Sequence, residues 1–155
     1  MTVDDALLEA LSSAPSDQAL QDLIKIRGLD VETVRALKAQ SAHFYSSRPA
    51  EAVRLGEIAR RLGDLLPDPA PALGRWALAN AMLFADRYKD AVTLFAQARH
   101  LFQAAGRALA SARAGVGHVW ALAYVGRFEE ALALAAEIEP VLMSQYDAAD
   151  LRRVG

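Results

Sequence analysis

The chain has 155 residues, of which 54% are hydrophobic, so it is long enough to bury a sizeable core. Its formal charge is −2 and no basic stripe is visible, which argues against a nucleic-acid partner, because phosphate contacts require clustered cations. Since cysteine is absent, disulfides, thiol catalysis and a Cys-ligated zinc are excluded.

The sequence also argues against membrane insertion and secretion. Asp4 and Asp5 stand where a secretory signal would carry positive charge. Fully apolar runs such as 131–136 are far shorter than the ~20 residues that span a bilayer. We therefore expect a soluble, cytoplasmic protein with no membrane contact.

The N-terminal segment, residues 1–30, is predicted to form a helical hairpin that caps the fold. Alanine and leucine dominate the chain and no period-two alternation persists, so helices are expected throughout. Thr2 or Asp4 can cap the first helix, and Ser16 or Asp17 can cap the second. These two helices are expected near 4–11 and 17–26.

Six further helices are predicted to form three antiparallel pairs. Proline and glycine residues separate the pairs, and short polar turns join the two helices within each pair. A fourth pair is expected to begin near 150–152. The six helices are placed near 31–46, 49–62, 70–85, 88–104, 109–125 and 128–143, which gives repeats of about 31–63, 70–104 and 109–144.

A repeated sequence pattern supports this pairing. The stretches 48–53, 87–92 and 127–132 each begin with arginine and carry an alanine at the same place. These marker alanines, Ala52, Ala91 and Ala131, lie 39 and 40 residues apart. A small residue at such a position lets two helix backbones approach closely. The period is typical of a solenoid built from stacked helical pairs.

These residues resemble the tetratricopeptide repeat (TPR). Repeat one departs from the pattern, with Pro49 and Gly56 where aromatic residues are expected, and repeat three has Ala135 in place of the later aromatic. The resemblance implies an all-α, right-handed superhelical solenoid that serves as a protein-interaction scaffold. It rests on Leu78, Ala79, Tyr88, Ala91, Phe95 and Ala98 of repeat two and on Gly126, Phe128 and Ala131 of repeat three.

A second resemblance concerns the longer period. Extended, alanine-rich repeats of this kind are similar to those that precede bacterial CHAT domains, which are caspase-like protease modules. The Cys/His pair of such a module has no counterpart in this chain. The resemblance implies a regulatory or helper domain in the N-terminal part of a longer protein.

The chain carries no recognisable catalytic, metal or cofactor motif. His43, His100 and His118 fall on three different predicted helices, and His118 is expected to be a core histidine with a local hydrogen bond. Adjacent carboxylates such as Glu129 and Glu130 point about 100° apart on a helix and cannot share a substrate. We therefore expect no enzymatic activity, no metal and no cofactor.

The remaining candidate site is a groove for a protein or peptide. In the TPR family the first helix of each pair lines the concave side, where peptides usually bind. An alternative stays open, in which the aromatic side chains of the predicted groove pack against one another as part of the core. The family's carboxylate clamp is not predicted, because only Lys38 and Arg113 lie near its positions. The groove residues are Leu37, Ser41, Tyr45, Trp76, Asn80, Phe84, Val116, Trp120 and Tyr124.

Another role also stays open. The last pair has no predicted capping helix, so we expect either that the chain is the N-terminal piece of a longer protein or that a partner covers its apolar end. That partner can be a second copy of the chain, in which case the protein is a homo-oligomer joined through its C-terminal end.

Overall fold

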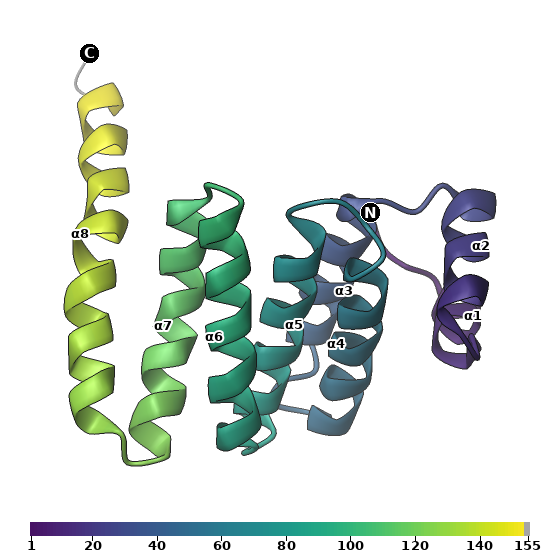
Figure 1. The fold of residues 1–155 in the computed structure, drawn as a ribbon, viewed down its shortest axis with the longest axis horizontal. Helices are drawn as coiled ribbons and strands as arrows, with labels where there is room; N and C mark the ends of the chain where they lie inside the picture. The colour runs from purple at the N-terminus through teal and green to yellow at the C-terminus, as the bar shows by residue number, and fades with distance from the viewer. Residues whose placement is uncertain (154–155) are drawn as a thin grey trace.

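The structure of the protein is a computed structural model, which gives the backbone of residues 1–153 and the side chains of residues 1–146. This part of the chain holds eight helices and no strand, which confirms the all-α prediction (Figure 1). The helices are α1 (Asp5–Ser13), α2 (Asp17–Arg27), α3 (Val31–Ala42), α4 (Pro49–Gly63), α5 (Ala70–Phe84), α6 (Tyr88–Ala104), α7 (Ala108–Tyr124) and α8 (Phe128–Arg153).

The first three helices begin at capping residues that the sequence offers. The Asp4 carboxylate accepts the backbone N–H of Leu7, and Ser16 Oγ accepts that of Ala19. At α3, Asp30 and Thr33 form a reciprocal capping box. Each cap satisfies backbone donors that a helix start would otherwise leave unpaired.

The last three helices begin 20 residues apart, at residues 88, 108 and 128. Each is preceded by a residue with left-handed backbone and then by an arginine, whose N–H donates to a carbonyl five residues back in the preceding helix. The same turn therefore joins helices within a pair and between pairs. The left-handed residues are Asp86, Gly106 and Gly126, and the arginines are Arg87, Arg107 and Arg127.

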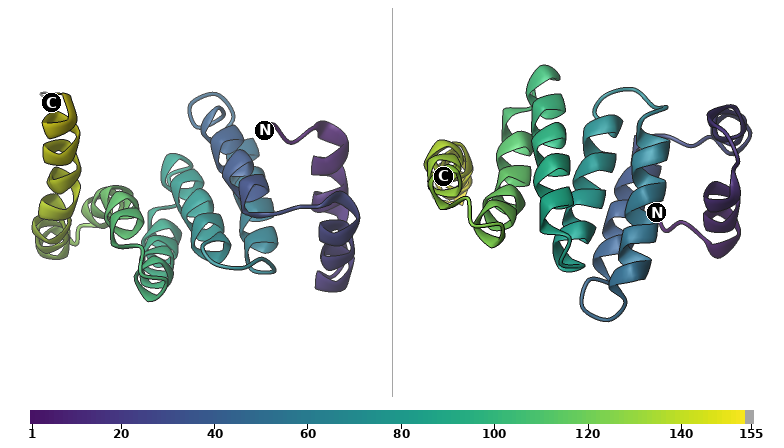
Figure 2. Two further views of the ribbon diagram at one scale, coloured as in Figure 1. Left: turned by 90° about the horizontal axis from the view of Figure 1, so that it is seen from above. Right: turned by 60° about the horizontal axis from the view of Figure 1, so that its bottom comes forward.

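From α3 onward the helices pack in the order of the sequence (Figures 1 and 2). Each helix packs on the next one along the chain, and α5 also contacts both α3 and α7. Within the described residues, substantial packing between alternate helices occurs only between α3 and α5 and between α5 and α7, which are the first helices of the three pairs. The layer of α3, α5 and α7 is therefore the more closely spaced, inner side of the row.

Small residues allow this close packing. The marker residues Ala52, Ala91 and Ala131 are buried, and each is the fourth residue of its helix. Between α4 and α5 the backbones come closer still, because a Cβ built on Gly74 would lie 2.5 Å from the carbonyl oxygen of Ala59. The repeat seen in the sequence thus has a structural counterpart in equivalent buried positions.

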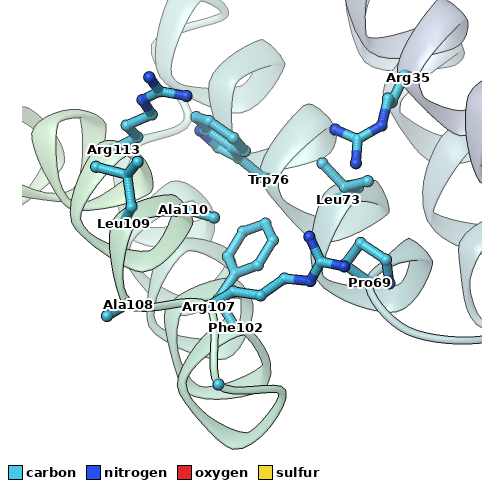
Figure 3. A pocket seen from close by; sticks show the side chains of 11 residues that line it. Arg35, Pro69, Leu73, Trp76, Phe102, Arg107, Ala108, Leu109, Ala110 and Arg113 are labelled. Atoms are coloured by element: carbon cyan, nitrogen blue, oxygen red, sulfur yellow. The ribbon is translucent and has the colours of Figure 1, made fainter. Parts of the chain in front are cut away.

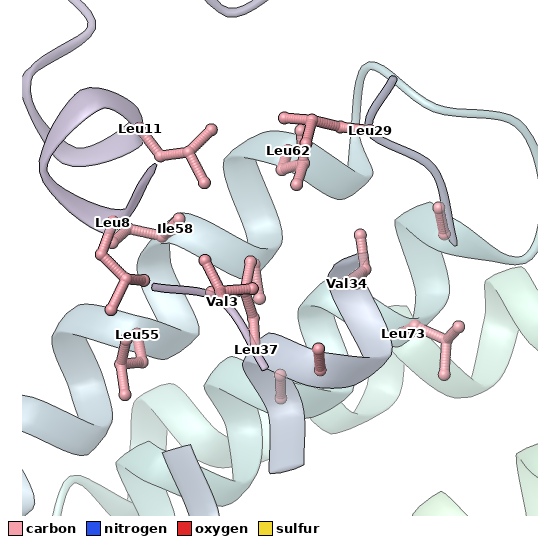
Figure 4. Packing of buried hydrophobic residues seen from close by; sticks show 14 of the residues in the cluster. Val3, Leu8, Leu11, Leu29, Val34, Leu37, Leu55, Ile58, Leu62 and Leu73 are labelled. Atoms are coloured by element: carbon pink, nitrogen blue, oxygen red, sulfur yellow. The ribbon is translucent and has the colours of Figure 1, made fainter. Parts of the chain in front are cut away.

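Helix α1 packs on the first pair (Figure 4), and Leu20 of α2 belongs to the same apolar cluster. Leu8 and Leu11 of α1 belong to one apolar cluster with Ile58 of α4. The backbone of Val3 also exchanges two hydrogen bonds with the Gln40 side chain of α3, at 2.6 and 3.1 Å. These contacts cover the outer face of the first pair.

Two predicted helix ends were wrong. The helix expected to reach Ser46 ends at Ala42, after which 3₁₀-type hydrogen bonds tighten the chain toward Arg48. The last helix was expected to end near 143, but α8 continues past Pro140 to Arg153, because neither glycine nor a second proline interrupts residues 141–153. The separate helix predicted near 150–152 is therefore part of α8.

In the part of the chain that the structure describes, no helix combines the length and the apolar character that a bilayer crossing requires.

Candidate functional site

Two of the predicted groove residues, Leu37 and Ser41, lie in the core and are fully buried. Ser41 Oγ donates a 2.8 Å hydrogen bond to the carbonyl of Ala52 and so ties α3 to α4. The prediction of an accessible position was wrong for both. Six residues connect α3 to α4, whereas three connect α5 to α6. The 39-residue period, which relates Leu37 to Trp76 and Ser41 to Asn80, therefore does not hold for these first helices.

Three other predicted residues come together at one end of α3 and α5. The rings of Tyr45 and Phe84 stack with centroids 4.3 Å apart. Burial raises the pKa of the Tyr45 hydroxyl, and the neighbouring Asn80 side chain offsets part of that rise. The stacked rings join the chain after α3 to the end of α5, while Phe84 remains 51% exposed.

Tyr45, Phe84 and Tyr124, three of the predicted groove residues, belong to two separate aromatic stacks. Tyr124 stacks on Tyr88 of α6, with centroids 4.5 Å apart, and lies 6.3 Å from Trp120. Trp120, Tyr124 and Val116 all remain exposed on α7. The aromatic residues of α7 thus form a surface distinct from the stacked pair of Tyr45, in the connection after α3, and Phe84 of α5.

A cavity of about 410 Å³ opens between α3, α5 and the turn from α6 to α7 (Figure 3). Its apolar wall is formed by Leu73, Trp76, Phe102 and Ala110, and the Trp76 ring meets Phe102 edge-on at 5.8 Å. Arg35, Arg107 and Arg113 also line it, and no acidic residue does. The Arg113 guanidinium donates a 2.8 Å hydrogen bond to the Gln145 side chain of α8. We call this site the inner basic pocket.

The electrostatics of the inner basic pocket favour an anionic ligand. Lys38 places its Nζ 4.0 Å from the centroid of the Trp76 ring, a cation–π contact. Burial, and then the nearby charge of Arg35, lower the pKa of Lys38. Glu32 compensates Arg35 at 3.3 Å, but both side chains are exposed, so the pair is weak.

Of the residues that define this pocket, the sequence indicated Trp76 and Arg113 but not Arg35 or Arg107. These two arginines are 72 positions apart in the chain and line the same pocket because α3 and α7 both pack on α5. The available signal was the pair of cations Arg35 and Lys38, which are three residues apart and so share a helix face.

A second cavity, of about 630 Å³, lies between α6 and α8 beside His118. His118 is buried as predicted, and its Nδ1 lies 3.5 Å from Arg99 Nη1. Burial, followed by the charges of Arg99 and Arg127, lowers the pKa of His118 to about 4. The ring is therefore neutral at pH 7 and packs against Phe95.

This histidine should make stability depend on pH. Its folded-state pKa is below the unfolded value of 6.5, so its contribution is complete above pH 6.5 and is lost as the pH falls toward 4. We expect about 1–2 kcal/mol of unfolding free energy to be lost between pH 7 and 4.5, after allowing for solvent screening. Urea unfolding at both pH values should show a smaller loss for His118→Gln than for wild type. His100→Gln, an exposed change on α6, is the matched control, and an equal pH dependence in all three proteins would contradict the prediction.

Across the described residues, no three His, Cys, Asp or Glu side chains gather in a way that could hold a metal ion. No protein-family model, curated protein or solved structure matches this chain.

Proposed function

We propose that this protein is a TPR-like scaffold that binds a protein or peptide partner through the inner basic pocket. In this proposal the helix pairs α3/α4, α5/α6 and α7/α8 are three repeats of a right-handed superhelix, and α1 and α2 form its N-terminal cap. The ordered packing of neighbouring helices and the three buried marker alanines support this interpretation. A helper role beside a caspase-like module stays a prediction that rests on the resemblance of the extended, alanine-rich repeats.

The observation that carries the proposal is the composition of the pocket. A guanidinium group binds a carboxylate through paired, charge-assisted hydrogen bonds, and three arginines line the pocket together with the apolar wall. Trp76 is half-buried and can anchor an apolar side chain of the partner. The preferred ligand is therefore a peptide segment in which an acidic residue adjoins a leucine or an aromatic residue.

Selection from a displayed library of random peptides tests this proposal without a known partner. The enriched peptides should pair an acidic residue with an apolar one. Their affinity, measured by isothermal titration calorimetry, should fall about tenfold or more in Trp76→Ala and in Arg113→Ala, because each loses an anchor or a charge-assisted hydrogen bond. Arg87→Ala, which changes an arginine in the turn between α5 and α6, should bind as wild type does.

Two results would reject the pocket as the binding site. One is a selection that enriches no peptide, and the other is binding that is equal in all three variants. If the acidic residues of the selected peptides can be changed to their amides without loss of affinity, the pocket remains the binding site but the argument from charge is rejected.

A further inference from the structure

The strongest unexplained surface is an apolar groove of about 420 Å³ between α7 and α8, which we call the end groove. Its walls include Val119 and Trp120 of α7 and Ile138 and Leu142 of α8. Trp120 is 58% exposed and Met143 is 51% exposed, which is high for large apolar side chains. Glu139 is the acidic residue that lines it.

The 40-residue period shows what this surface corresponds to inside the protein. Ala135, Ile138 and Leu142 are the counterparts of Phe95, Ala98 and Phe102 on α6. Those three counterparts are fully or almost fully buried. The end groove is thus equivalent to the surface of α5 and α6 that α7 covers.

Contacts of α7 with that surface are direct. A Cβ built on Gly117 would overlap the Phe95 ring, and that ring also lies 6.1 Å from the ring of His118. Nearer the start of α7, Ser111 Oγ donates to the carbonyl of Arg99 at 3.4 Å. The interface that α7 makes with α6 therefore continues, one repeat later, as the open face of α8.

We propose that the end groove binds an amphipathic α-helix of a partner protein, which lies along α7 and α8 as α7 lies along α5 and α6. This surface is separate from the inner basic pocket, and the proposal stands independently of the proposed function. The end groove repeats the surface of α5 and α6 that holds α7. Because that surface holds a helix, we infer that the occupant of the end groove is also a helix.

The side-chain sizes at equivalent positions of successive helix–helix interfaces indicate which partner helix fits the end groove. On α4, Gly56 faces Leu78 of α5, and on α6, Phe95 faces Gly117 of α7. A small side chain is thus met by a large one, and a large one by glycine. At the equivalent place on α8 stands Ala135, which is small and half-buried. The docked helix should therefore carry a bulky apolar residue, such as leucine, over Ala135.

The charge of the groove adds a second requirement. On α6, Arg99 faces His118 of α7, whereas its counterpart on α8 is Glu139. An acidic side chain at this place favours lysine or arginine on the docked helix, one residue after the bulky position.

Two synthetic peptides test the proposal. Both reproduce residues 108–124 with Trp120→Lys and Tyr124→Lys for solubility. The glycine peptide keeps Gly117, and the leucine peptide also carries Gly117→Leu. The protein carries Trp76→Phe, so Trp120 in the end groove is its single tryptophan and its fluorescence reports binding. The leucine peptide should bind about tenfold or more tightly than the glycine peptide, because a leucine side chain fills the space over Ala135.

A reciprocal change in the protein makes the test specific. Ala135→Phe recreates the arrangement at Phe95 and should reverse the preference, so that the glycine peptide binds more tightly. Helicity measured by circular dichroism checks that this variant folds, and Ala135→Leu gives a second variant with the same expected reversal. A further change, His118→Lys in the peptide, should strengthen binding to wild type but not to Glu139→Gln.

Three results would overturn the proposal. They are no binding of either peptide, equal affinities that Ala135→Phe does not change, and a protein that is dimeric before peptide is added and loses this dimer in Trp120→Lys. The third result would assign the end groove to a second copy of the chain.

Discussion

Replacing Gly74 by alanine should destabilise the protein by about 2–4 kcal/mol, although alanine is the better helix former by about 1 kcal/mol. The added Cβ would lie 2.5 Å from the carbonyl oxygen of Ala59 and 2.8 Å from the Cα of Arg60. Both atoms belong to the backbone of α4, so no side-chain rotation can relieve the contact. The two helices must separate, and the buried contacts around Leu62 and Leu73 are weakened as a result.

Urea unfolding followed by circular dichroism measures this loss, and Gly126→Ala is the control. Gly126 has a φ of +83°, and a Cβ built on it meets nothing within 4 Å. Its substitution therefore costs only backbone strain, about 1–2 kcal/mol. If Gly74→Ala were as stable as wild type, the close approach of the α4 and α5 backbones would be incorrect.

Much of the fold was predictable because its determinants are local. Asp4 and Ser16 cap helices with their own side chains, and Pro49 suits the first position of α4, where its missing N–H costs nothing. The bounds of α6 were predicted to the residue, since Asp86 and Gly106 adopt left-handed backbone on either side of it. The end of α8, expected near 143, was not predicted, because residues 141–153 hold no glycine or proline that would mark it.

The candidate site was less predictable because it depends on register between helices. Counting back from Trp76 by 39 residues leads to Leu37, but the longer connection after α3 rotates that position into the core. The accessible face of α3 instead presents Arg35 and Lys38. A repeat alignment without gaps gives the correct register for the second helices, because the marker alanines lie there. It gives the correct register for the first helices only where the turns within the pairs have equal lengths.

The same size relation that selects the helix for the end groove predicts a strong coupling inside the core. Phe95→Ala should destabilise the protein by about 3–5 kcal/mol, because a fully buried ring leaves a cavity between α6 and α7. Gly117→Ala should cost about 1–3 kcal/mol in wild type, where the new methyl group meets the Phe95 ring. In the Phe95→Ala background the same change should be neutral or stabilising, since the ring is gone and alanine favours the helix.

The double-mutant cycle should therefore give a coupling energy of about 2 kcal/mol or more. Phe102→Ala is the matched control, because it also removes a buried ring of α6, while the atoms nearest to a Cβ on Gly117 all belong to Phe95. Its effect and that of Gly117→Ala should add within about 0.5 kcal/mol. A coupling near zero for Phe95 and Gly117 would mean that large and small residues are not matched across this interface. The preference for a bulky side chain over Ala135 would then lose its physical basis, even if a helix binds there.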